Sequence, residues 1–221
     1  MPKLKVNFKK QFGRDLGLPS WNSSLDKKVE LRHWILETLA VSNPRILDCY
    51  CGPGGMWEKA YSSTSNYVGL DKTLYRDSRT TLVCENVDYL KSADLDQFDV
   101  FDLDAFGSPM EALAITCNRI RWKSRSRIGI VLTDGTGLNA KLNATSVAYV
   151  KYLGISRHRK TPIQNKERDT FLKMCIYKAV QEADAHIEAI KVYAKAKGAA
   201  MRYIGLILSH GQPQGGETKG P

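Results

Sequence analysis

The chain has 221 residues, 43% of them hydrophobic, which suits one globular domain large enough to bury a core. It has no apolar run near the roughly 20 residues that span a bilayer, and its basic N-terminus lacks the apolar segment of a signal peptide, so we expect a cytoplasmic protein with no membrane partner. The formal net charge of +10 favours a polyanionic partner such as nucleic acid.

The N-terminal part predicts a basic, irregular arm followed by a helix. Residues 1–22 are basic and are interrupted by glycine and proline, which indicates an irregular arm. The segment 23–26 has the residues of a helix start. Apolar side chains then recur at helical spacing, so a helix should cover one face of a sheet and end near Pro44. Its inward residues are predicted to be Leu31, Trp34, Ile35 and Leu39.

The segment 45–55 reads as a buried strand, a carboxylate and a glycine-rich turn into a helix at about 54–61. Asp48, Gly52 and Gly54 resemble D-x-x-x-G-x-G, the first motif of S-adenosylmethionine (SAM) methyltransferases. Glycine lets a ligand approach the bare backbone. The spacing differs from the G-x-G-x-x-G of dinucleotide-binding proteins, and a carboxylate suits a cationic ligand better than a phosphate. A tight turn with no ligand remains the alternative.

Three further predicted strands also stop at acidic residues. They cover about 67–71, 82–87 and 99–104, and lead to Asp71, Asp88 and Asp104. Each aspartate alone could be a helix cap or a turn residue. Because ligands bind at the carboxyl ends of parallel strands, four such positions in succession favour a ligand site, with Asp71 suited to ribose hydroxyls.

The remaining pattern predicts an α/β fold. Strands and helices alternate, and two final strands flank a turn, so we expect a Rossmann-like seven-stranded methyltransferase sheet with helices on both faces and a C-terminal antiparallel hairpin. This domain should cover 23–210, before a disordered tail at 211–221. The later elements are expected at 93–97 (helix), 109–120 (helix), 128–133 (strand), 167–185 (helix), 187–194 (strand) and 201–208 (strand).

The five cysteines predict free thiols and no metal site. Cys49 and Cys51 form C-x-C, but no second cysteine or histidine pair stands at zinc-ligand spacing. Buried thiols are the better interpretation.

A basic segment late in the chain is the predicted nucleic-acid contact. Clustered cations can follow a line of phosphates, although a solvated surface segment is the alternative. The residues are Arg157, Arg159, Lys160, Lys166 and Arg168.

The segment 102–109, DLDAFGSP, predicts the reaction. Amino-methyltransferases place an acid or amide followed by an aromatic residue at the end of the fourth strand. A carboxylate such as Asp104 can accept a hydrogen bond from an amine and orient its lone pair. An aromatic ring such as Phe106 gives a base a stacking surface. Thr133 and Asp134 end the next strand, where they could contact the target or form a turn.

DLDAFGSP resembles D-x-D-P-F-G-S-P, the hallmark of the tRNA guanine-N2 dimethyltransferase family, with Ala105 in place of proline. The resemblance covers about 44–136. It implies that Asp104 contacts the target amine, that Phe106 lines the base pocket, and that SAM is the cofactor. The chain is too short for the large C-terminal domain of that family, so substrate contact is expected from the arm, from 137–168 or from a partner protein. The predicted SAM-binding residues are Asp48, Tyr50, Gly52, Gly54, Asp71, Lys72, Val87, Asp88 and Asp104.

The leading hypothesis is SAM-dependent methylation of an exocyclic amino group of a nucleic-acid base, with RNA guanine preferred over DNA. One alternative is a DNA adenine or cytosine amino-methyltransferase. Another is a non-catalytic nucleic-acid-binding protein that retains the SAM fold. The glycine spacing disfavours a nicotinamide dehydrogenase.

Overall fold

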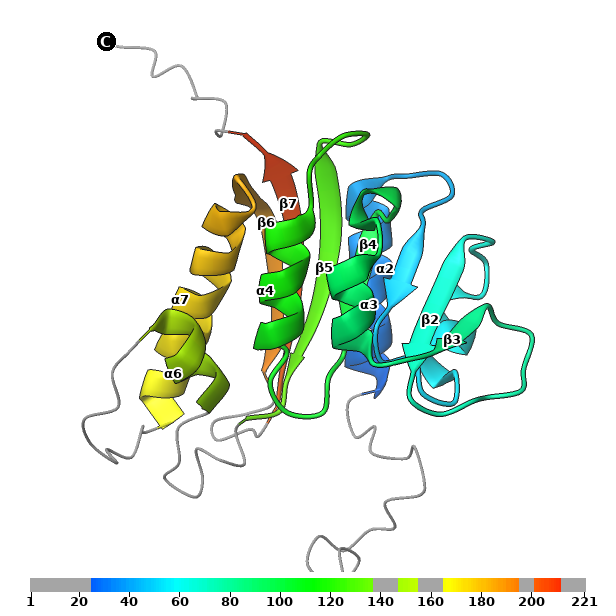
Figure 1. The fold of residues 1–221 in the computed structure, drawn as a ribbon, viewed down its shortest axis with the longest axis horizontal. Coiled ribbons are helices and arrows are strands. Elements are labelled where there is room, and N and C mark those ends of the chain that lie inside the picture. The colour runs from blue at the N-terminus through cyan, green and yellow to red at the C-terminus, as the bar shows by residue number, and fades with distance from the viewer. Residues whose placement is uncertain (1–24, 137–146, 155–164, 195–200, 212–221) are drawn as a thin grey trace, which may run out of the picture.

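The computed structural model describes residues 25–136, 147–154, 165–194 and 201–211, and it is built around one seven-stranded sheet (Figure 1). The strand order is β3-β2-β1-β4-β5-β7-β6. Neighbours from β3 to β5 are parallel, whereas β7 is antiparallel to both β5 and β6. The strands are β1 (Ile46–Asp48), β2 (Tyr67–Asp71), β3 (Thr81–Val83), β4 (Val100–Leu103), β5 (Arg127–Asp134), β6 (Ala185–Ala194) and β7 (Arg202–His210).

Helices cover both faces of the sheet. Figure 1 shows α3, α4, α6 and α7 in front of the sheet and α2 behind it. A short π-helical turn, η1, contacts α2, and a 3-10 turn, η2, leads into β4. The helical elements are α2 (Leu25–Leu39), η1 (Trp57–Tyr61), α3 (Asn86–Ser92), η2 (Leu95–Gln97), α4 (Met110–Arg119), α6 (Val147–Leu153) and α7 (Asn165–Glu182).

The prediction of an α/β sheet with an antiparallel C-terminal pair is confirmed. Every residue of β1 and β4 is buried, as expected for strands covered on both faces. The final strand β7 enters between β5 and β6, so β6 becomes the edge strand. None of the helices in the described ranges is long and apolar enough to cross a membrane.

The element boundaries differ from the predictions in three places. The predicted strand at 82–87 ends at Val83, and α3 begins at Asn86. The predicted helix at 54–61 begins at residue 55 and takes the π-helical form η1 over Trp57–Tyr61. Helix α6 has no counterpart among the predicted elements. The predicted arm at 1–22 and the tail after Gly211 lie outside the described residues.

Helix α2 packs very closely on the sheet. Its apolar stripe of Leu31, Ile35 and Leu39 is buried, and the helix contacts both β5 and β7. Glycine at the contact allows this approach, because a Cβ built on Gly129 would lie 2.4 Å from Ile35 Cγ2. A Cβ built on Gly205 of β7 would likewise lie 2.8 Å from Leu31 Cδ1. The side chains of α2 therefore pack directly against the backbone of β5 and β7.

We predict that Gly129→Ala lowers the free energy of unfolding by about 1–3 kcal/mol, because the added methyl group overpacks the contact with α2. Urea denaturation measures this change. Gly55→Ala is the matched control, since its Cβ would meet nothing within 4 Å, and its stability should stay level or rise slightly. Equal stabilities of the wild type and Gly129→Ala would contradict the described packing of α2.

Candidate functional site

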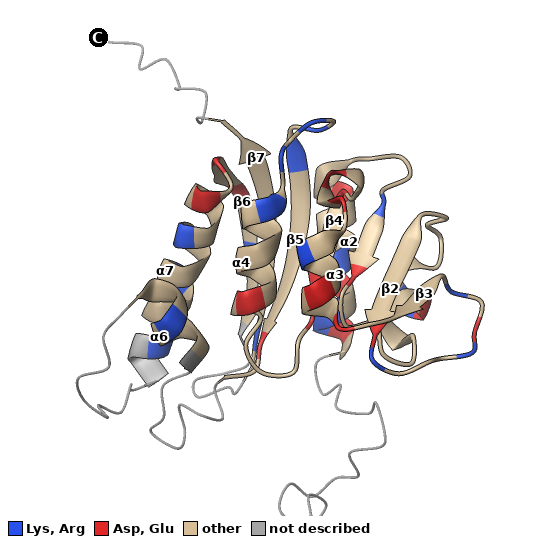
Figure 2. Ribbon diagram, viewed as in Figure 1, with Lys and Arg blue, Asp and Glu red and all other residues tan. Residues whose placement is uncertain are grey.

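The carboxyl ends of the parallel strands bring three of the predicted acidic residues to one edge of the sheet. Asp71 ends β2, Asp48 ends β1, and Asp104 follows β4 directly. Strands β2, β1 and β4 are adjacent in that order. Figure 2 shows acidic residues at the lower ends of β2, α3 and β5, which form this same edge. The edge is the candidate site.

The glycine turn is tied to the second strand through Asp71. The Gly52 N–H donates to Asp71 Oδ2 at 3.1 Å, and the Thr73 N–H donates to Asp71 Oδ1 at 2.8 Å. Each carboxylate oxygen has two lone pairs, so both oxygens can accept a further hydrogen bond. Asp71 can therefore shape the turn and still bind a ligand hydroxyl.

Arg79 holds the glycine turn after β1 through the backbone carbonyls of that turn, a role that the sequence patterns did not predict. Its guanidinium donates to the carbonyls of Cys51 (3.3 Å) and Gly52 (2.9 Å), and it pairs with Asp77. Gly54 has a φ of +93°, and a Cβ there would lie 2.9 Å from Arg79 Cζ. Glycine is thus required at position 54 by both conformation and space.

A buried ionic cluster lies beneath the site; its members are Lys28, Arg32, Asp48, Asp102 and Asp104. Arg32 donates to both oxygens of Asp102, at 2.6 and 2.9 Å, and to Asp104 at 3.1 Å. Lys28 donates to both oxygens of Asp104, at 2.8 and 2.6 Å. Burial alone would raise the pKa of Asp104, but Lys28 and Arg32 hold that pKa below its ordinary value. Asp104 is therefore ionised at neutral pH.

Asp48 has a different environment from Asp104. Its oxygens accept hydrogen bonds from the Tyr50 N–H (3.2 Å) and the Tyr67 hydroxyl (2.9 Å), which are both neutral donors. Burial and the neighbouring Asp102 carboxylate raise the pKa of Asp48 to about 7. The pKa of Asp102 is also raised by burial, but Arg32 and the Tyr61 hydroxyl bind Asp102 directly. Of Asp48 and Asp102, Asp48 is therefore the carboxyl group that keeps a proton.

Phe106 is the most open residue of the predicted site. Its side chain is 95% exposed, whereas the neighbouring Ala105 is buried. The Gly135 N–H donates to the Gly107 carbonyl at 2.6 Å, which ties this loop to the end of β5. The Ser108 hydroxyl accepts from the Met110 N–H at 3.3 Å, at the start of α4. The loop is thus anchored directly after an outward-facing ring.

Several predicted cofactor residues occupy other local environments. The prediction that Asp88 follows a strand was wrong, because Val87 and Asp88 lie in the first turn of α3. The Asn86 side chain donates to the Cys49 carbonyl at 3.1 Å and thereby joins that helix start to the turn after β1. Lys72 forms an exposed ion pair with Glu85 at 2.8 Å. Tyr50 packs partly against the core, and burial raises its pKa to about 12.

Arg168 does not belong to a solvent-facing basic surface. It is 3% exposed and donates to Asp134 at the end of β5, where Asp134 also accepts from the Thr136 N–H at 3.0 Å. The predicted role of Arg168 in nucleic-acid contact is replaced by a structural one, because its guanidinium is held inside the protein. Arg157, Arg159, Lys160 and the Lys166 side chain lie outside the described part of the chain.

One sequence pattern could have predicted that Lys28 and Arg32 belong to the site. Lys28 and Arg32 are four residues apart and lie on the same side of α2 as Leu31 and Ile35. Two cations within an inward-facing helical stripe indicate buried carboxylate partners, because a buried charge is costly unless paired. The partners themselves, 70 and 76 residues away, could not be identified from spacing.

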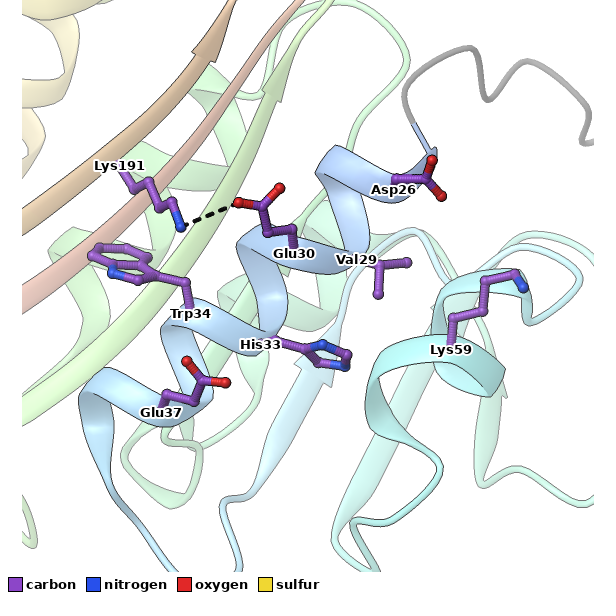
Figure 3. A pocket seen from close by; sticks show the side chains of 8 residues that line it. All are labelled: Asp26, Val29, Glu30, His33, Trp34, Glu37, Lys59 and Lys191. Atoms are coloured by element: carbon purple, nitrogen blue, oxygen red, sulfur yellow. Dashed lines mark ion pairs between the residues drawn. The ribbon is translucent and has the colours of Figure 1, made fainter.

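A separate groove runs over the outward side of α2, flanked by Lys191 of β6 and Lys59 of η1 (Figure 3). It has a volume of about 660 Å³. Its wall contains none of the predicted site residues, and Glu30 there already pairs with Lys191 at 3.5 Å. This groove is therefore distinct from the candidate site. Its lining residues are Asp26, Val29, Glu30, His33, Trp34, Glu37, Lys59 and Lys191.

The sheet order and the placement of helices are those of the Rossmann-like fold of SAM-dependent methyltransferases. Among solved structures, the chain is similar to Trm1 from Pyrococcus horikoshii in complex with S-adenosyl-L-methionine, with a TM-score of 0.58 and 20% identity. The match covers 85% of this chain but only 55% of the Trm1 chain. The plantazolicin methyltransferase BpumL is also similar, with a TM-score of 0.51, 12% identity and 86% coverage of both chains.

No protein-family model and no curated protein sequence matches the chain. At these identities the structural similarity establishes the fold, and function has to be argued from the site.

We predict that the stability of the protein depends on pH through Asp48. Its folded-state pKa of about 7 lies above its ordinary value of 3.8, so the folded state holds a proton that the unfolded state has lost between these values. The contribution of Asp48 to stability should therefore fall as pH rises toward 7, by up to about 1.4 kcal/mol per pH unit, and level off above it.

Urea unfolding of the wild type and of Asp48→Asn, from about pH 5 to pH 8, measures this contribution as a difference. The free energy of unfolding of the wild type minus that of Asp48→Asn should decrease with rising pH. Glu37→Gln is the matched control and should follow the wild type, because the Glu37 side chain is exposed and forms no ion pair with any residue in the described ranges. Parallel curves for the wild type and Asp48→Asn would contradict the raised pKa.

Proposed function

We propose that this protein is a SAM-dependent methyltransferase that acts on an exocyclic amino group of a nucleic-acid base, with guanine in RNA as the preferred target. One observation carries the proposal: an ionised, hydrogen-bonded carboxylate, Asp104, is followed after one buried residue by an outward-facing ring, Phe106. Both stand at the end of β4, next to the glycine turn that follows β1.

The residues around the glycine turn fit SAM as the cofactor. The turn leaves Asp71 with acceptor capacity for the two ribose hydroxyls, about 20 residues after Gly52. Asp48 lies between Asp71 and Asp104 in the strand order, where the methionine part of the cofactor would lie. A carboxylate at that point suits a ligand with ammonium and sulfonium groups.

Asp104 would act as the acceptor for the target amine. An exocyclic amine of a base is a poor nucleophile, because its lone pair is delocalised into the ring. With SAM bound, the amine nitrogen bonds to a methyl carbon on a positively charged sulfur, the electrons of the broken C–S bond stay on that sulfur, and the nitrogen loses a proton. Asp104 accepts the amine N–H, orients the lone pair and passes the proton to water.

Lys28 and Arg32 would keep this acceptor in one protonation state and one orientation. They occupy both lone pairs of Oδ2 of Asp104 and one lone pair of Oδ1, and the Thr133 hydroxyl also helps to lower the pKa of Asp104, so the target amine would bind at the second Oδ1 lone pair beside Thr133. Positioning of this kind is the main contribution that the protein can make, because the methyl group is already activated.

Phe106 would provide the stacking surface for the base. Base–aromatic stacking contributes about 1–3 kcal/mol per base, and the ring is 95% exposed in the described structure. A base within a duplex would first have to leave its stack. A single-stranded loop of RNA meets this requirement more easily than duplex DNA, which favours RNA.

Two other functions remain to be separated by experiment. A DNA adenine or cytosine amino-methyltransferase would use the same acid and aromatic residue. A non-catalytic protein would bind SAM and nucleic acid without turnover.

Incubation with labelled SAM and separate pools of tRNA, rRNA and duplex DNA distinguishes these two functions from the proposed one. We expect label in tRNA or rRNA, recovered as an N2-methylated guanine nucleoside; label in duplex DNA would overturn the RNA preference, and no label would overturn the catalytic proposal.

We predict that Asp104→Asn lowers the rate of methyl transfer by roughly 10²- to 10⁴-fold, because the amide cannot accept and pass on the proton as a carboxylate does. SAM affinity, measured by calorimetry, should change much less. Asp184→Asn is the control with an equivalent change at the opposite end of the sheet, where β6 begins. Equal turnover by Asp104→Asn and the wild type would remove Asp104 from the mechanism.

A further inference from the structure

The buried cluster beneath the site has one positive charge fewer than it has carboxylates. Arg32 and Lys28 supply two cations, whereas Asp48, Asp102 and Asp104 are three acids. Both cations are used by Asp102 and Asp104, at 2.6–3.1 Å. In the described part of the chain no ion pair reaches Asp48, which is 2% exposed and bonded by neutral donors. The uncompensated charge is thus at Asp48.

The other groups around Asp48 cannot supply the missing charge. Asp48 and Asp102 are register partners on adjacent parallel strands, so two carboxylates face one arginine. The remaining titratable neighbours are neutral at pH 7, because burial raises the pKa of every thiol and phenol among them. These neighbours are Tyr61 on η1, Tyr67 on β2, and Cys49 and Cys51 in the turn. A proton or a cationic ligand must complete the balance.

We propose that the bound cofactor supplies this charge, and that its binding expels one proton from Asp48. This inference rests on the proposed function. Ionised Asp48 and the sulfonium of the ligand would then compensate each other's charge across the glycine turn. The affinity of the site would thereby depend on the charge of the ligand as well as on its shape.

The proposal has a direct consequence for donor and product. SAM carries a positive sulfur, whereas S-adenosylhomocysteine carries a neutral one, and both have the same amino-acid end. Asp48 stays ionised beside the donor and takes its proton back beside the product. The cluster should therefore favour the donor over the product, and it should do so more strongly above pH 7 than below it.

Calorimetric titration in buffers with different enthalpies of ionisation measures the protons released on binding. At pH 7 we expect SAM to release about 0.5 proton, because the Asp48 pKa of about 7 leaves half of the sites protonated. Sinefungin, which has an ammonium group in place of the methylated sulfur, should behave like SAM. S-adenosylhomocysteine should release far less.

The same titrations across pH give a second measurement that needs no variant. Between pH 7.5 and pH 5.5 the Kd of SAM should rise by about 25-fold, while that of S-adenosylhomocysteine should rise much less. In Asp48→Asn the proton release and the preference for SAM should both disappear. Asp71→Asn is the matched control: it should weaken both ligands equally and retain the proton release.

Three outcomes separate the possible failures. Equal proton release with SAM and S-adenosylhomocysteine would overturn the inference and leave the proposed function standing. Proton release that persists in Asp48→Asn would do the same. Failure of all three ligands to bind the wild type would overturn the proposed function, and this inference with it.

Discussion

The ion pairs of Arg32 with Asp102 in β4 and with Asp104 directly after it are the interaction on which the site depends. Removing one partner of such a buried pair costs about 3–5 kcal/mol, because the other charge stays behind without compensation. Arg32 is 1% exposed, and its position is set by the close contact of α2 with Gly129 and Gly205. Packing on the back of the sheet therefore determines the electrostatics at its edge.

The site combines a lower, hydrogen-bonded layer at the strand ends with an upper layer, the exposed loop after β4. Below, Arg32, Arg79 and Asp71 fix the strand ends and the glycine turn through hydrogen bonds of 2.6–3.3 Å. Above, Phe106 points outward from a loop that Gly135 anchors. Such a division suits chemistry in which the acceptor group is preorganised and the substrate closes the pocket.

Sequence patterns were sufficient for the fold and for the positions of the main acids. Asp48, Asp71 and Asp104 follow from local strand patterns together with the rule that parallel strands share a carboxyl edge. The pattern was misleading for Asp88, because polar Asn86 starts a helix where apolar spacing suggested a strand. It could not reveal that Arg168 pairs with Asp134, or that Lys28 meets Asp104, since contacts across 34 and 76 residues depend on tertiary packing.

The placement of β7 has a consequence for how the protein is made. The centre of the Tyr203 ring in this strand lies 5.5 Å from the Lys28 ammonium, and Gly205 faces Leu31. The residues that cover the first described helix thus come from the last described strand. On the ribosome, a nascent chain in which residues 202–210 have not yet been synthesised cannot complete the packing around Lys28 and Leu31, so α2 reaches its final environment only after β7 has emerged.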